Sequence, residues 1–151
     1  MTGEQKLEAP RERVWQALND TEVLKQCLPG CKSLERESDE RMSAVLAIKV
    51  GPIGASFSGA VTLSDVDPPN AYTLAVEGQG GTAGMVSGTA KVQLSDDGEA
   101  TMLRYEVAAQ VGGRLAQLGG PIIDATAKQL AKNFFKKFGE QVVAAESAPK
   151  L

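Results

Sequence analysis

The chain has 151 residues, 42% hydrophobic and 23% charged, which is the composition of a globular domain long enough to bury a single core. A net charge of −3 argues against a general nucleic-acid binder, and the lack of any histidine excludes Ser–His, Cys–His and histidine–metal sites. No apolar run reaches the roughly 18 residues that span a bilayer, and residues 1–6 do not form a secretion signal, so we expect a cytoplasmic protein.

The N-terminal part of the chain predicts a short strand followed by two short helices. Residues 3–8 alternate weakly, as an edge strand does, and Pro10 suits the first turn of a helix that ends near Leu18. Asn19 and Asp20 then offer an N-cap for a second helix over residues 21–26, which Pro29 and Gly30 bring to an end.

The middle of the chain changes to the alternating period of β-strands. Short turns rich in glycine, proline, asparagine and aspartate separate the strands, so neighbours are expected to pair as antiparallel hairpins. Alternate positions place apolar side chains, such as Tyr72, Leu74 and Val76, on one face of the sheet and mostly polar ones on the other. We place the strands at residues 32–37, 41–50, 53–66, 71–79, 85–95 and 100–111.

Residues 119–143 predict a long C-terminal helix, which starts at a Gly-Gly-Pro break. At 1.5 Å per residue it is roughly 35 Å long, so only a curved sheet can cover its apolar face. Phe135 lies on the flank of that face. The residues that form the face recur at helical spacing and are Ile123, Ala127, Leu130, Phe134 and Phe138.

This order of elements predicts an α+β helix-grip fold. A curved antiparallel sheet of about six to seven strands is expected to wrap around the long helix, with two short helices after the first strand. We expect a single domain at residues 1–143 and a flexible C-terminal tail at residues 144–151.

Many positions that face the interior of this fold are small, which favours a cavity between the sheet and the helix. Core residues and ligand-binding residues lie on the same inward face, so the sequence does not separate the two roles. The residues that we expect to bind a hydrophobic ligand are Leu46, Ile48, Phe57, Val61, Leu74, Val76, Tyr105, Ile123, Ala127, Leu130 and Phe134.

Basic residues form a stripe on another face of the long helix. Lys128, Lys132 and Lys136 repeat every four residues, and Arg114 precedes them. The simplest interpretation is a solvated helix face, and the functional one is docking on an anionic membrane or an acidic partner.

Other motifs in the sequence lack the context that their chemistry requires. Cys27 and Cys31 are expected to be reduced thiols, because two cysteines without a histidine or a third cysteine fall short of a zinc site. Residues 78–83 match the spacing of a dinucleotide-binding loop, but a predicted strand follows them instead of a helix. With no acid–base pair either, the sequence predicts no catalytic residue, no metal and no cofactor.

A series of short motifs resembles a known family over residues 2–143. They are CLPGC at 27–31, KVGPI at 49–53, FSG at 57–59, DPP at 67–69, GQGG at 78–81, QVGG at 110–113 and AQLG at 116–119. In this order they resemble the carbon monoxide dehydrogenase G-subunit family of the START-like (SRPBCC) superfamily. The resemblance implies a helix-grip fold with a hydrophobic cavity, and partners among the subunits of carbon monoxide dehydrogenase or a related molybdenum hydroxylase.

The resemblance also implies a role at the membrane, since family members have been linked to attaching the enzyme to its cytoplasmic face. Some members carry a long C-terminal extension, whereas this chain ends at Leu151, so peripheral membrane contact is expected from the domain surface or a bound partner. The hypothesis is a non-catalytic accessory protein that binds a lipid or an isoprenoid quinone. The alternative is a recruitment or assembly adaptor without a ligand. A cyclase or aromatase activity, known in the superfamily, is disfavoured because the chain lacks histidine and an acid–base pair.

Overall fold

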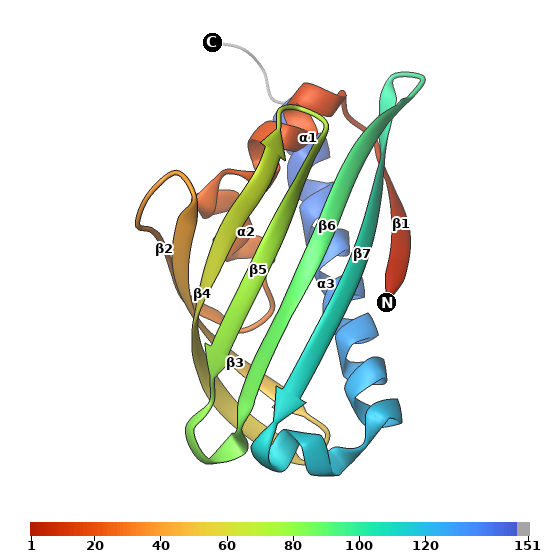
Figure 1. The fold of residues 1–151 in the computed structure, drawn as a ribbon. Helices are drawn as coiled ribbons and strands as arrows, with labels where there is room; N and C mark the ends of the chain where they lie inside the picture. Colours follow the sequence, from red (N-terminus) through yellow and green to blue (C-terminus); the bar gives the residue numbers. More distant parts are fainter. Residues whose placement is uncertain (148–151) are drawn as a thin grey trace.

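The C-terminal helix α3 (Gly120–Ser147) lies in the concave face of a curved sheet in the computed structural model, which describes residues 1–147 (Figure 1). The sheet has seven strands in the order β1-β7-β6-β5-β4-β3-β2, and each neighbouring pair is antiparallel. Two short helices, α1 (Arg11–Leu18) and α2 (Thr21–Cys27), lie at one end of the sheet. The predicted helix-grip fold is confirmed.

The strands follow the sequence prediction closely. Their bounds are β1 (Thr2–Leu7), β2 (Cys31–Arg36), β3 (Arg41–Val50), β4 (Ile53–Asp67), β5 (Ala71–Gln79), β6 (Met85–Asp97) and β7 (Ala100–Gly112). The turn between β6 and β7 is shorter than predicted, because Gly98 adopts a φ of +64°, a conformation that favours glycine. β6 therefore continues to Asp97 instead of ending at residue 95.

Two 3₁₀ helices and the end of α3 differ from the sequence prediction. η1 (Gly81–Ala83) lies where a turn was expected, and η2 (Gly113–Leu118) fills the connection between β7 and α3. α3 continues to Ser147, into the segment expected to be a flexible tail, and residues 148–151 lie outside the described part of the chain. A 3₁₀ helix is too short to leave a periodic pattern in the sequence.

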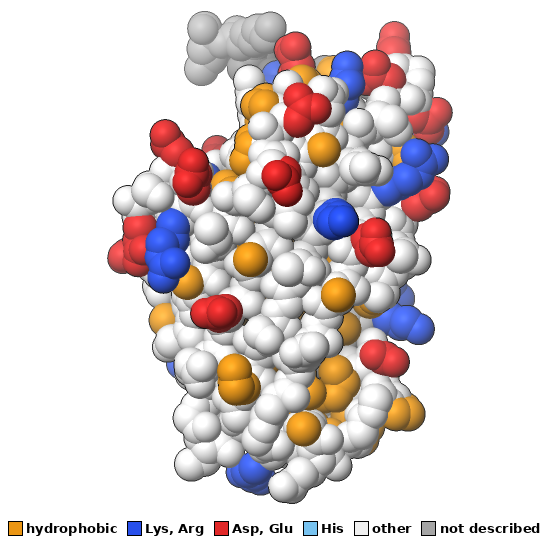
Figure 2. All heavy atoms as spheres, in the orientation of Figure 1, with side chains coloured by type: hydrophobic (Ala, Val, Ile, Leu, Met, Phe, Trp, Pro, Cys, Tyr) orange, Lys and Arg blue, Asp and Glu red, His pale blue; other side chains and the backbone are white. Residues whose placement is uncertain are grey.

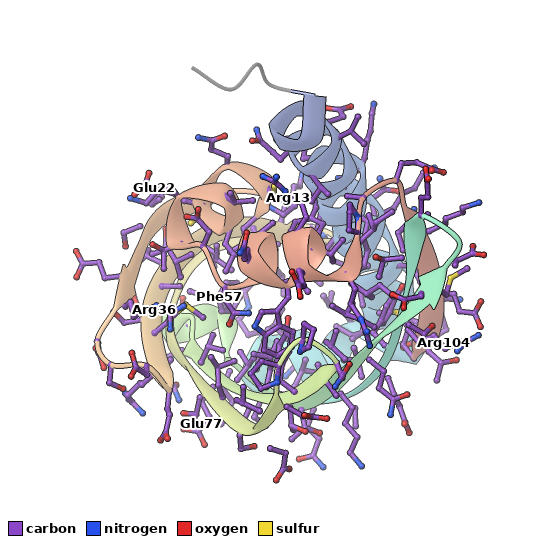
Figure 3. All side chains as sticks on the ribbon, turned by 90° about the horizontal axis from the view of Figure 1, so that it is seen from above. Arg13, Glu22, Arg36, Phe57, Glu77 and Arg104 are labelled. Carbon is purple, nitrogen blue, oxygen red and sulfur yellow. The ribbon has the colours of Figure 1, made fainter. Side chains whose placement is uncertain are left out.

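Local chemistry explains where the short helices begin. α1 follows Pro10, whose φ of −64° is the value that the proline ring imposes. Asp20 caps α2, because its carboxylate accepts a hydrogen bond of 2.9 Å from the backbone N–H of Glu22. Seen from above, both helices lie over one end of the sheet (Figure 3), and residues of both line the inner cavity described below.

The interior is packed most tightly at its two ends. At the α1 end, Val14, Phe138 and Val142 are no more than 1% exposed and join α1, α3 and the sheet in one buried cluster. At the opposite end, Leu115 of η2 is also 1% exposed and packs in a second cluster with Phe57. Side chains between the two clusters are only partly buried, and the cavities lie beside them.

Candidate ligand-binding site

Two apolar cavities lie between the sheet and α3. The outer cavity has a volume of about 240 Å³ and lies next to η2. The inner cavity has a volume of about 400 Å³ and reaches under α1 and α2. The two cavities adjoin, because β3, β4, β5 and α3 contribute wall residues that they share. These are Ala44, Leu46, Ile48, Val61, Val76 and Leu130.

The residues predicted to bind a ligand all line this interior. Of the two cavities, Phe57, Ile123 and Ala127 line only the outer one. Leu74, Tyr105 and Phe134 line only the inner one. The remaining predicted residues, Leu46, Ile48, Val61, Val76 and Leu130, belong to both walls. The structure therefore brings them together in space, while their contact with a ligand stays a prediction.

Small residues in register across three strands leave room for the outer cavity. Ala44 pairs with Gly59, and Gly59 pairs with Gly78, so a row with almost no side-chain volume crosses the concave face. The two glycines have different roles. A Cβ atom on Gly59 would collide with the carbonyl oxygen of Glu77, whereas a Cβ on Gly78 would have its nearest neighbour 4.0 Å away, at the carbonyl oxygen of Val86. Gly59 thus permits a close backbone approach, and Gly78 leaves open space.

Aromatic side chains distinguish the inner cavity from the outer one. Tyr72, Tyr105, Phe134 and Phe135 line the inner cavity, whereas Phe57 is the one aromatic residue among the described wall residues of the outer cavity. The rings contact one another, with centroids 5.3 Å apart for Tyr105 and Phe135 and 5.1 Å apart for Phe134 and Phe135. The inner cavity can therefore accept a flat ring, and the outer cavity suits an aliphatic chain.

A surface groove between β7 and α3 leads to the outer cavity. β1 pairs with β7 only up to Glu106, so the second half of β7 has no strand beside it on this edge. The groove has a volume of about 1070 Å³ and shares Val76, Glu77, Ala109, Ile123 and Ala127 with the outer cavity. Ala109 is exposed and Ile123 is partly exposed, which makes this groove the candidate entrance for an apolar molecule.

The residues predicted to dock on a membrane or partner are all at the surface. Lys128, Lys132 and Lys136 are exposed on α3, and Arg114 is exposed on η2. Within residues 1–147, none of the four takes part in a salt bridge. Lys128 also lies on the rim of the entrance groove. Their accessibility is compatible with docking, and docking stays a prediction.

Acidic and thiol groups are not arranged for metal chemistry in the part of the chain that is described. No group of three or more Cys, Asp or Glu side chains there could hold a metal ion. Cys27 is buried and Cys31 is half-buried, and both thiols are free. Burial is the main cause that raises the pKa of each thiol, so both stay protonated near neutral pH.

Among the described helices, none is long and apolar enough to cross a membrane.

Several wall residues were missing from the predicted site. Tyr72 lines the inner cavity, and its place on the same alternating face as Leu74 was a usable signal. Gly78 lies two residues after Val76 on the same face of β5, but a glycine has no apolar side chain that would mark it as a wall residue. Leu115 lies in η2, where neither helical nor strand periodicity applies. The further wall residues of the outer cavity that were not predicted include Val50, Val86 and Val111.

Comparisons with known proteins agree with this architecture. A family model described as the G subunit of carbon monoxide dehydrogenase (CoxG) matches residues 3–143. A conserved protein from Geobacillus kaustophilus is 32% identical over 95% of each chain, with a TM-score of 0.90. The Zhui aromatase/cyclase from Streptomyces sp. R1128 is 12% identical over 98% of this chain and 95% of that one, with a TM-score of 0.67. Ara h 8.0201 is 16% identical over 95% of this chain and 97% of that one, with a TM-score of 0.68. A comparison of the sequence with curated proteins found no match.

Proposed function

Because the chain belongs to the CoxG family of carbon monoxide dehydrogenase, we propose that it is a non-catalytic accessory protein that holds an apolar ligand between its sheet and α3. In this proposal it serves a molybdenum hydroxylase-type dehydrogenase at the membrane. The family is named after one subunit of carbon monoxide dehydrogenase, which supports an accessory role. The aromatase/cyclase is similar at only 12% identity, so its activity is not transferred to this chain.

The adjoining apolar cavities are the observation that supports ligand binding most strongly. Small-molecule sites typically occupy about 300–1,000 Å³ and are lined mainly by apolar side chains. The outer cavity of about 240 Å³ and the inner cavity of about 400 Å³ together fall in this range. A tightly packed core has few voids larger than a water molecule, so a space of this size is a feature that packing alone does not require.

The shape and lining of the interior favour a lipid or an isoprenoid quinone as the ligand. Both kinds of molecule are long, and a quinone joins a flat ring to an aliphatic tail. The interior likewise joins an aromatic part to an aliphatic part. A dehydrogenase that reduces membrane quinone needs its acceptor brought out of the lipid, and a carrier with an apolar interior meets that need.

The distribution of charge supports approach of the η2 end to the membrane. Figure 2 shows acidic side chains gathered toward the α1 end, whereas the opposite end shows mostly uncharged and apolar atoms. Met85 and Ile122 are 44% and 39% exposed, and both belong to segments at the η2 end. Lys49 and Arg114 are exposed there too, and each basic residue near an anionic surface contributes about 1 kcal/mol. In this orientation the outer cavity faces the lipid.

Extraction from vesicles tests the proposal. The protein is mixed with phosphatidylglycerol vesicles that contain ubiquinone and menaquinone, the vesicles are removed by sedimentation, and the supernatant is extracted with organic solvent for mass spectrometry. We expect quinone or phospholipid in the supernatant in an amount comparable with the protein. A supernatant free of both, with the protein folded by circular dichroism, would refute ligand carriage.

The adaptor alternative has one observation in its favour, the stripe of exposed lysines on α3. Replacing Lys128, Lys132 and Lys136 together with glutamate reverses its charge. Lys91→Glu is a control for charge reversal at a single site elsewhere, because Lys91 is exposed on β6 and away from α3. The adaptor would be favoured if the triple variant alone no longer sediments with the vesicles and if no ligand is extracted from the wild-type protein. Retained ligand extraction in the triple variant would favour the carrier.

A further inference from the structure

Tyr72 lines the apolar inner cavity, and its hydroxyl group has no hydrogen-bond partner among the described residues. Tyr72 lies near the start of β5, is 7% exposed and lines the inner cavity. No hydrogen bond to its hydroxyl is formed by any described residue. Each fully enclosed side-chain nitrogen or oxygen in the described chain does have a partner. The Tyr72 oxygen is therefore not fully enclosed, and the space that its side chain borders is the cavity.

The surroundings of Tyr72 keep this hydroxyl neutral and available as a donor. Its ring packs edge-on against Trp15 of α1, with centroids 5.4 Å apart, and it belongs to a cluster of buried apolar residues. Burial raises the pKa of Tyr72 well above its ordinary value. The phenol consequently keeps its proton at physiological pH. A ligand acceptor that excludes water from this apolar cavity would therefore be held by a hydrogen bond from the phenol.

The other polar side chains of the cavities already have partners or reach the surface. Glu77 borders the outer cavity and is exposed. Thr126 borders the outer cavity, but its hydroxyl donates to the carbonyl oxygen of Ile122 at 2.9 Å. Asn19 borders the inner cavity, and its amide donates to the carbonyl oxygen of Trp15 at 2.9 Å. Tyr105 also lines a groove on the outside of β1 and β7, so its hydroxyl can meet water. Tyr72 is thus the buried donor that a ligand can use.

We propose that the ligand binds with its ring inward, so that a ring carbonyl oxygen accepts a hydrogen bond from the Tyr72 hydroxyl. The aliphatic tail then fills the outer cavity and points to the groove between β7 and α3. This inference rests on the proposed function, narrows its ligand to molecules with an accepting ring oxygen, and adds the direction in which the ligand binds. The ring lies among Tyr105, Phe134 and Phe135, and the tail lies along the row of small residues at Gly59 and Gly78. The specificity is for an apolar molecule with one accepting oxygen at its inner end.

The test compares two ligands of similar length in wild-type protein and in Tyr72→Phe. Decylubiquinone carries ring carbonyls, and dodecylbenzene carries a ring without an acceptor. Trp15 is the one tryptophan of the chain, so its fluorescence reports a quinone ring bound beside Tyr72. We expect decylubiquinone to quench Trp15 in the wild type. In Tyr72→Phe its affinity should fall about 3- to 10-fold, the range of one hydrogen bond, whereas the affinity of dodecylbenzene should stay within about 2-fold.

The outcomes separate this inference from the proposed function. Calorimetric binding of decylubiquinone without quenching, or an equal loss for both ligands in Tyr72→Phe, would overturn the inward orientation and leave ligand carriage standing. No calorimetric binding of either ligand to the wild type would overturn both. The melting temperature of the ligand-free Tyr72→Phe protein should be unchanged or higher, because no hydrogen bond is lost. A clear decrease would show that the hydroxyl has a structural partner and would refute its assignment to the ligand.

Discussion

Replacing Gly78 with valine should stabilise the ligand-free protein and at the same time weaken ligand binding. Gly78 is buried in β5 and faces the outer cavity, where an added Cβ would have no atom closer than 4.0 Å. Valine adds three carbons to this space, and a β-branched residue suits a strand better than glycine. The substitution therefore fills the cavity without displacing the backbone.

The expected magnitudes follow from the size of the added group. Burying three carbons at about 0.8 kcal/mol each sets an upper bound near 2.4 kcal/mol, and cavity-filling changes usually stabilise by about 0.5–2 kcal/mol. For a domain of this length, the melting temperature should rise by about 1–8 °C. A ligand tail that must share the cavity with the new side chain loses about 1–3 kcal/mol, which is about 5- to 150-fold in affinity.

Differential scanning calorimetry and a decylubiquinone titration measure the two effects. Gly54→Val is the matched control, because Gly54 lies in the same sheet but is exposed, and no atom lies within 4 Å of the position that its Cβ would take. It should leave the affinity unchanged. If Gly78→Val raises the melting temperature but binds decylubiquinone as tightly as the wild type, the outer cavity is not part of the site. If it lowers the melting temperature, the space beside Gly78 is not free.

Two further predictions concern buried and half-buried side chains outside the cavity walls. Thr101→Val should destabilise the protein by about 1–3 kcal/mol in urea unfolding, because the buried Thr101 hydroxyl donates to the carbonyl oxygen of Ala9 at 2.8 Å; no change in the unfolding midpoint would contradict that role. Cys31 should react with iodoacetamide faster than the buried Cys27, as peptide mass spectrometry can measure. Since burial raises the pKa of both thiols, their labelling should increase only at a higher pH than that of a free cysteine, and rapid labelling of Cys27 at pH 7 would refute its burial.

Most of the fold could be predicted because its signals are local. Alternation identified the strands, Asp20 marked the start of α2, and the spacing of Ile123, Leu130 and Phe138 identified the apolar face of α3. The inward faces followed from the same alternation. η2 was not predicted, because a 3₁₀ helix of six residues is too short to show a period that can be read from its sequence.

The division of the interior could not be predicted because it depends on contacts between distant segments. The row of Ala44, Gly59 and Gly78 exists only through strand register, which the sequence does not specify residue by residue. Phe135 was expected on the flank of α3, yet it stacks on Tyr105 and borders the inner cavity. The availability of the Tyr72 hydroxyl depends on the absence of a nearby acceptor among the described residues, and such a property appears only in three dimensions.

Native mass spectrometry of the protein purified from its own host tests the central claim most directly. The intact mass is measured under gentle conditions, and the protein is then extracted with organic solvent to identify what is released. We expect a near-stoichiometric quinone or lipid that is depleted in Gly78→Val and retained in Gly54→Val. A protein that carries no apolar molecule, and that co-purifies with large dehydrogenase subunits in this empty form, would contradict ligand carriage and favour the adaptor.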